Sequence, residues 1–245
     1  MHALTGERLL EAWDRGFNQS DLTRPLTLLG VSCPERSTAE IAGLSLAERD
    51  LDLWRLRRLT FGEWLRATLP CAGCAQQIEF TLALTTVVEP LERLSLAMPP
   101  QKQIEGWNIS MRPVTTSDLE AVLAFEDAES AKQALMERCG SFASSDGTIS
   151  SWRDASEAAR TAAMALFEAM HEGAEFTCET VCPQCGAVEL ADLDIGRFLW
   201  FEVRNAARRL LLEIHELASA YGWSEAAILG MSPQRRQGYL AMVRA

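Results

Sequence analysis

The chain has 245 residues, of which 48% are hydrophobic and 23% charged, and its formal net charge at pH 7 is −11. A chain of this length and composition buries a hydrophobic core, which excludes a wholly disordered protein. The acidic balance disfavours a nucleic-acid partner, because non-specific binding to phosphates rests on basic side chains. No apolar run is long enough for a membrane helix, and the N-terminus lacks the pattern of a signal peptide, so we expect a cytoplasmic protein with no membrane partner.

Residues 1–69 are predicted to form an N-terminal helical part. Apolar residues recur at helical spacing in LLEAWDRGF, and Ser45 and Glu48 have the spacing of a capping box, which satisfies free backbone amides at a helix start. We expect the helix that begins there to end at Gly62. Clustered arginines in this and later segments are interpreted as solvated helix faces: Arg55, Arg57, Arg58, Arg208, Arg209, Arg235 and Arg236.

Residues 70–88 hold the first C-x-x-C pair, Cys71 and Cys74, and then a predicted strand. In QIEFTLAL the apolar side chains alternate with Glu79 and Thr81, which is the period of a half-buried strand. The pair therefore lies immediately before a strand.

Residues 89–174 are predicted to be a mainly helical insertion. The Pro-Pro and the charges of residues 88–104 indicate a loop, and WNISMRP is a short alternating segment. Ser117 and Glu120 have the spacing of a second capping box, and a clear helix in EAARTAAMALFEAM is expected to end at Gly173. Between the helices, SFASSDGTISS is predicted to be a loop.

Residues 175–194 contain the second pair, Cys182 and Cys185, in the turn CPQCG, again followed by a predicted strand. Residues 195–245 are predicted to form C-terminal helices. Ser224 and Ser232 are expected to cap the last two helices, the second with Pro at its first position. The predicted fold class is α+β and mostly helical, with a split zinc-ribbon-like element that carries the insertion.

The two pairs together predict a structural zinc site formed by Cys71, Cys74, Cys182 and Cys185, because four thiolates complete the tetrahedral set of such sites. In a zinc ribbon, each C-x-x-C turn is called a knuckle, and about 15 to 20 residues usually separate the two knuckles. Here 107 residues lie between Cys74 and Cys182. Antiparallel pairing of QIEFTLAL with AEFTCETV is expected to bring the ends of the insertion together. The alternatives are a thioredoxin-type redox pair, which favours a strand-to-helix junction, and unrelated cysteines.

The three remaining cysteines are interpreted as small buried residues: Cys33, Cys139 and Cys178. Participation of Cys178 in the metal site is left open. No motif of a hydrolase, phosphate-binding loop or dinucleotide site is present, and the histidines fall in no catalytic pattern. A four-thiolate zinc has no open position for water, so we predict a protein that is not an enzyme.

At the start of the long C-terminal helix, Phe198, Trp200 and Phe201 widen the apolar surface beyond one buried stripe. They are interpreted either as packing residues or as a partner-binding patch, since exposed aromatic clusters mark protein interfaces.

The order of these features resembles the baseplate hub assembly chaperone family of T-even-type contractile-tailed bacteriophages and related contractile injection systems. The similarity is carried by CAGCAQQIEFTLAL, by RPVTTSDLEAVLAFEDAESAKQALMERC and most specifically by the stretch from CPQCGAVELADLDIGRFLWFEVRN to SPQRRQGYLAMV. The resemblance implies an assembly factor, chaperone or minor component, whose partners are baseplate hub or spike proteins. The alternative is a zinc-ribbon nucleic-acid-binding or regulatory protein. A thiol oxidoreductase is a third class, which requires one reactive, exposed cysteine pair.

Overall fold

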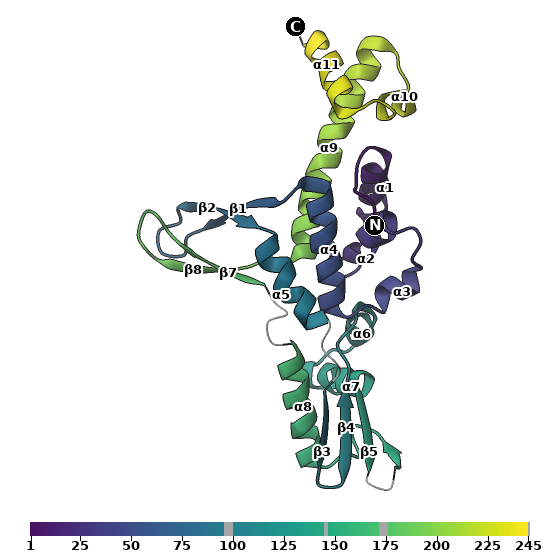
Figure 1. Cartoon of the computed structure of the whole chain (residues 1–245), viewed down its shortest axis with the longest axis vertical. Helices are drawn as coiled ribbons and strands as arrows, with labels where there is room; N and C mark the ends of the chain where they lie inside the picture. Colours follow the sequence, from purple (N-terminus) through teal and green to yellow (C-terminus); the bar gives the residue numbers. More distant parts are fainter. Residues whose placement is uncertain (96–99, 145–146, 172–175, 245) are drawn as a thin grey trace.

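The computed structural model describes residues 1–95, 100–144, 147–171 and 176–244. The fold is α+β, with 54% helix and small antiparallel sheets, as the sequence predicts. Figure 1 shows four parts, which we call the body, the arm, the lower lobe and the tip. The arm projects sideways from the body, and the lower lobe and the tip lie at opposite ends of the long axis.

The body is a bundle of helices around the main hydrophobic core. Leu28, Leu53 and Leu199 are fully buried in it, and Trp54 is nearly so. The helices are α1 (Glu7–Gly16), α2 (Arg24–Ser32), α3 (Thr38–Ala42), α4 (Leu46–Phe61), α5 (Thr85–Ser95) and the first half of α9 (Ile195–Tyr221).

The predicted limits of α4 are confirmed. Ser45 accepts a hydrogen bond from the Glu48 amide, and the Glu48 carboxylate accepts one from the Ser45 amide, which completes the capping box. Gly62 ends the helix with a φ of 92°. The predicted loop over residues 88–104 is wrong, because α5 continues to Ser95. Val87, Val88 and Leu91 of this helix pack in the body core, and this tertiary packing outweighs the unfavourable Pro90 inside the helix.

The arm consists of two β-hairpins. Strands β1 (Trp64–Pro70) and β2 (Gln77–Ala83) form one, and β7 (Thr177–Val181) and β8 (Val188–Asp192) form the other. The expected pairing of QIEFTLAL with AEFTCETV is therefore wrong, and WLRATLP is a strand that the sequence reading missed. Each C-x-x-C segment forms a short turn, so the strands on either side of it pair with each other. The loop-closure entropy of such a short turn is small.

The lower lobe lies within the predicted insertion. A four-stranded antiparallel sheet is covered by α8, and its small core includes Met111, Phe142 and Trp152. The elements are β3 (Gln101–Ile104), β4 (Trp107–Met111), α6 (Thr116–Val122), α7 (Ala128–Cys139), β5 (Gly140–Ser144), β6 (Ile149–Ser150) and α8 (Glu157–His171).

The lower lobe corrects three expectations. The insertion contains a sheet as well as helices, and strands β5 and β6 replace part of the predicted loop SFASSDGTISS. The second capping box is formed by Thr115 and Asp118, not by Ser117 and Glu120. Asp118 is preferred because it also pairs with Arg112 and Arg138 inside the lobe. The predicted helix stop at Gly173 lies outside the described residues.

The tip packs α10 (Glu225–Leu229) and α11 (Pro233–Val243) against the end of α9, and Ser224 and Ser232 cap them as predicted. Arg236, interpreted as solvated, is buried and pairs with Glu213. Among the described helices, none has the length and apolar character that a bilayer crossing requires.

Candidate metal centre

Each cysteine pair occupies the turn of one hairpin, and the two turns have the same backbone hydrogen bonds. The Cys71 amide donates to the Gln76 carbonyl at 2.8 Å, and the Cys182 amide donates to the Ala187 carbonyl at 2.8 Å. The fifth residue of each turn, Ala75 or Gly186, has a positive φ, 58° and 75° respectively. In both turns this residue donates its amide back to the carbonyl of the first cysteine. The two turns are therefore equivalent knuckles.

The knuckles meet at the end of the arm, so the four predicted cysteines lie together. Their Sγ atoms are all within 4.8 Å of one another. Two contacts cross between the hairpins, with 3.6 Å from Cys71 Sγ to Cys185 Sγ and 3.6 Å from Cys74 Sγ to Cys182 Sγ. A metal with bonds to sulfur of about 2.3 Å places four tetrahedral sulfurs about 3.8 Å apart. The cluster fits a tetrahedral four-thiolate metal ion.

The first cysteine of each knuckle is buried and the second is exposed. Burial raises the pKa of the Cys71 thiol to about 12, so the metal-free thiol holds its proton. The backbone amides of Cys185 and Gln184 lower the pKa of Cys182 to about 7, because they donate to its sulfur. Amides directed at sulfur stabilise the thiolate, which is the form that binds metal.

Two further features of the centre were not predicted. The Glu189 carboxylate in β8 accepts a hydrogen bond of 2.8 Å from the Ala72 amide in the first knuckle, and so links the hairpins beside the sulfurs. A small apolar cluster beneath the knuckles joins Cys71, Cys182 and Ile78. The sequence does not reveal this contact of Glu189, because it depends on how the two hairpins meet.

The other cysteines lie outside the centre. Cys33 and Cys139 are buried, as predicted. Cys178 is only half-buried, which corrects its interpretation as a buried residue; every residue of its strand, β7, is exposed or half-buried. Its sulfur is not one of the four that cluster.

The root of the arm is held by Arg57, which corrects its interpretation as part of a solvated face. The residue is 3% exposed, and its side chain forms two hydrogen bonds with the Glu202 carboxylate of α9, of 3.0 and 2.9 Å. It also donates to the carbonyls of Gly62 and Trp64, where the chain passes from α4 into β1. Arg57 therefore ties the first hairpin to the helix that follows the second hairpin.

The three aromatic residues at the start of α9 have different environments. Trp200 is 7% exposed, and its ring lies against Gly16 of α1 and under the Arg24 guanidinium. Its interpretation as a partner-binding residue is therefore corrected: it is a core residue, because only glycine at position 16 leaves room for the ring. Phe201 is 53% exposed, and Phe198 is partly buried on the main core.

The chain was compared with known proteins. No family model matches it, and neither a curated protein nor a solved structure matches it.

Proposed function

We propose that Cys71, Cys74, Cys182 and Cys185 hold one structural zinc ion and that the two knuckles form a split zinc ribbon. The observation that carries this proposal is the convergence of four thiols from two hairpins. Tetrahedral sets of four sulfurs are typical of zinc and of iron–sulfur sites, and zinc in such a set keeps no open position for a reacting water. The ion would serve to fasten the hairpins.

We further propose that the protein is a non-enzymatic assembly factor of the baseplate hub of a contractile tail or injection system. This role rests on the resemblance of the C-terminal stretch to that family. The architecture supports it, because the body, arm, lower lobe and tip offer separate surfaces to different subunits (Figure 1). The free cysteines support a reducing compartment such as the cytoplasm.

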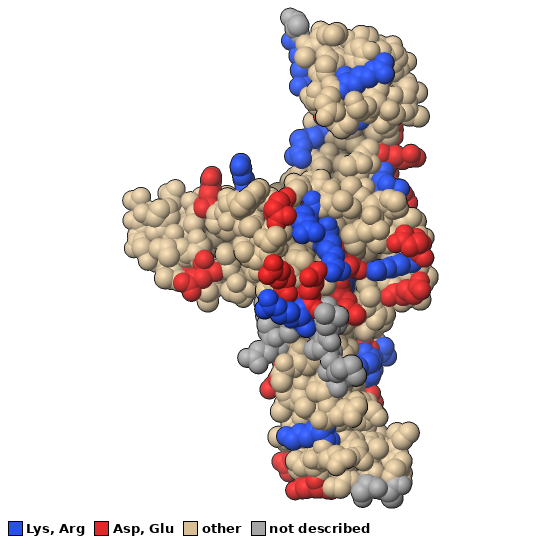
Figure 2. Space-filling view, in the orientation of Figure 1, with Lys and Arg blue, Asp and Glu red and all other residues tan. Residues whose placement is uncertain are grey.

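The alternative role in nucleic-acid binding has less support from the charge distribution. Residues 64–83 and 177–192 of the arm contain one basic residue, Arg66, and four acidic ones, Glu79, Glu179, Glu189 and Asp192. On the face shown in Figure 2, basic and acidic side chains are interspersed over the body instead of forming a basic stripe. Phosphate binding by a ribbon requires a basic surface beside the metal.

Elemental analysis of purified protein tests the metal proposal. We expect one zinc per chain and no visible absorption. A metal content near zero would contradict the site, and iron with a thiolate charge-transfer band would contradict zinc.

Deletion of the gene tests the assembly role. We expect sheaths or tubes without functional baseplates, while the other components are still made, and we expect the wild-type gene to restore particles. Affinity capture from cells that express the whole gene neighbourhood should recover hub or spike subunits. Contractile particles at normal yield without the gene would contradict the role, and salt-dependent DNA or RNA binding would then favour the regulator.

A further inference from the structure

The second hairpin of the arm has one open face. On this face of β7 and β8 every residue is exposed: Thr177, Glu179, Val181, Val188, Leu190 and Asp192. The strand register places them together, as in the direct pair of Val181 with Val188. The alternate residues of both strands are half-buried. We call the exposed side of this hairpin the outer face.

Three side chains of the outer face are large and aliphatic. Val181 is 56% exposed, Val188 is 59% exposed and Leu190 is 68% exposed. The two valines are directly opposite each other, and Leu190 follows Val188 on the same face of its strand, so the three form one contiguous cluster. A contiguous exposed apolar cluster, unlike scattered single residues, indicates an interaction surface.

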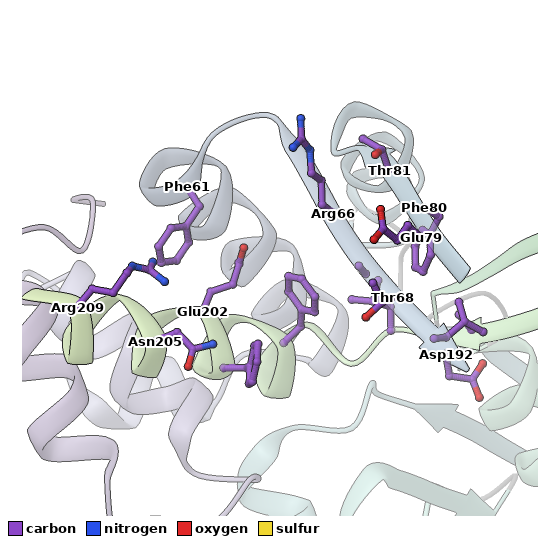
Figure 3. Close-up of a pocket in the computed structure, with 16 residues that line it drawn as sticks. Phe61, Arg66, Thr68, Glu79, Phe80, Thr81, Asp192, Glu202, Asn205 and Arg209 are labelled. Atoms are coloured by element: carbon purple, nitrogen blue, oxygen red, sulfur yellow. The ribbon is translucent and has the colours of Figure 1, made fainter. Parts of the chain in front are cut away.

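The first hairpin shows that a knuckle does not require an aliphatic outer face. Apart from Trp64 at its root, the corresponding exposed residues of β1 and β2 are mostly polar: Arg66, Thr68, Pro70, Gln77, Glu79 and Thr81. Several of these side chains are drawn in Figure 3. Because the two turns are equivalent, the aliphatic cluster of the second hairpin is not needed to form its knuckle.

The charge of the outer face is acidic. Glu179 and Asp192 lie on it, and neither forms an ion pair among the described residues. Asp192 accepts the Thr177 hydroxyl, which leaves its charge in place. Residues 177–192 contain no lysine or arginine. Glu179 is directly opposite Leu190, so a carboxylate borders the aliphatic cluster. Such a face favours a partner with basic side chains around apolar ones.

The charge and the size of the outer face disfavour other occupants. Nucleic acids and anionic lipids carry phosphates, which the carboxylates repel. A closed dimer uses the same patch on both copies, and here it would oppose two acidic faces. The face consists of two strands about 17 Å long and about 5 Å apart. It is far smaller than the roughly 800 Å² per partner that a stable interface buries, so it does not hold a second copy by itself.

We propose that the outer face binds a protein partner whose contact surface presents aliphatic side chains flanked by lysine or arginine. The aliphatic side chains would cover Val181, Val188 and Leu190, and a basic side chain would pair with Glu179. This inference rests on the proposed assembly role and describes the subunit surface that the arm would contact. The arm projects from the body, so a subunit can reach it (Figure 1). A small contact surface gives a reversible complex, as a factor that releases its subunit requires.

The test is methyl NMR of the metal-loaded full chain, titrated with an amphipathic peptide of leucine and lysine. We expect saturable shifts of the methyl groups of Val181, Val188 and Leu190, with binding that weakens as salt is added. Exposed aliphatic residues elsewhere are internal controls and should not shift: Leu123, Ile149 and Leu212. The same peptide with glutamate in place of lysine should bind the cluster more weakly.

Two variants of the outer face have matched controls. Leu190→Ala should weaken peptide binding about fivefold, and Glu179→Gln about threefold. Leu123→Ala and Glu225→Gln, which are exposed and outside the arm, should bind as the wild type does. The two glutamate variants change the net charge equally, so their comparison separates the outer face from a general attraction to an acidic protein. All four positions are exposed, and we expect unchanged melting temperatures and metal contents.

Three results of the titration would overturn the proposal: no saturable binding, equal loss in the control variants, or shifts spread equally over the control residues. Two further results would assign the face to another occupant and so contradict the proposal. One is self-association in sedimentation that Leu190→Ala abolishes, and the other is binding to phosphatidylcholine vesicles that the same variant abolishes.

Failure of the outer face is distinguishable from failure of the assembly role. If the peptide does not bind but hub subunits are captured equally by the wild type and by Leu190→Ala, the proposed face is wrong and the role stands. If the peptide binds as expected but gene deletion leaves particles intact, the role is wrong and the face stands.

Discussion

The hairpins β1–β2 and β7–β8 form the same knuckle from different residues. One turn reads CAGCA and the other CPQCG, yet the hydrogen bonds from the first cysteine and from the fifth residue are equivalent. Gly186 takes its positive φ without strain, whereas Ala75 takes the same conformation with a Cβ atom, which is unfavourable by about 1–2 kcal/mol. A non-glycine residue held in this region indicates that the surrounding structure imposes the turn.

The hairpins also differ in how they join the body. The first is held by a buried arginine, Arg57, which satisfies the carbonyls of Gly62 and Trp64. The second continues into α9 after the N-cap Asp194, and the buried ring of Trp200 anchors that helix. The first root depends on polar contacts and the second on packing, so they respond to different substitutions.

Loss of the proposed zinc ion should have the largest effect on stability, because its four cysteine ligands come from both hairpins. Zinc contributes about 10 kcal/mol or more to the folding free energy of isolated zinc-finger peptides. We expect a smaller loss of folding free energy here, since the body has its own core. Cys182→Ser should lower the metal content and the melting temperature. Cys178→Ser, outside the cluster, is the control and should melt as the wild type does. Equal melting of the Cys182 variant would show that the site is not structural.

Trp200→Ala tests the root of the second hairpin. Truncating a buried tryptophan leaves a cavity and should lower the free energy of unfolding by about 3–5 kcal/mol. Urea denaturation followed by circular dichroism measures the change. Phe201→Ala, on an exposed neighbour, should change stability by less than about 1 kcal/mol. Similar stability of the two variants would contradict the core position of Trp200.

Arg57→Met tests the root of the first hairpin. Removing one partner of a buried ion pair leaves Glu202 and two carbonyls without their donor, and should cost about 3 kcal/mol. Hydrogen exchange should become faster in β1 and β2 than in β7 and β8. The control is Arg58→Met, which removes an exposed arginine of the same helix. An equal increase in both hairpins would mean that Arg57 supports the whole arm.

Substitution of the fifth residue of each knuckle should change the free energy of unfolding least, and the change should have opposite signs in the two knuckles. Gly186→Ala should destabilise the fold by about 1 kcal/mol. Ala75→Gly should stabilise it by only about 0.5 kcal/mol, because the entropy that glycine adds to the unfolded chain offsets part of the relieved strain. A Cβ on Gly186 meets no atom within 4 Å, so its effect is purely conformational. Melting of the zinc-loaded variants measures both changes. A stabilising Gly186→Ala would contradict the backbone argument.

The features that the sequence predicted correctly depend on residues that are close together in the chain. The helix limits at Ser45, Gly62, Ser224 and Ser232 depend on caps within a few residues, and such signals need no knowledge of the fold. The two C-x-x-C turns were identifiable for the same reason. The grouping of their four thiols followed from coordination chemistry, which requires a complete set of ligands.

Only the tertiary structure decided which strands pair, which arginines are buried and where the aromatic residues face. Arg57 and Arg58 are adjacent and chemically identical, yet one is buried at the root of the arm and the other is exposed. The burial of Trp200 depends on Gly16, far away in the sequence, and the pocket that Phe201 lines is formed by residues of two hairpins together with α4 and α9 (Figure 3). Periodicity identifies the apolar face of an element, but the partner of that face is set by contacts between distant segments.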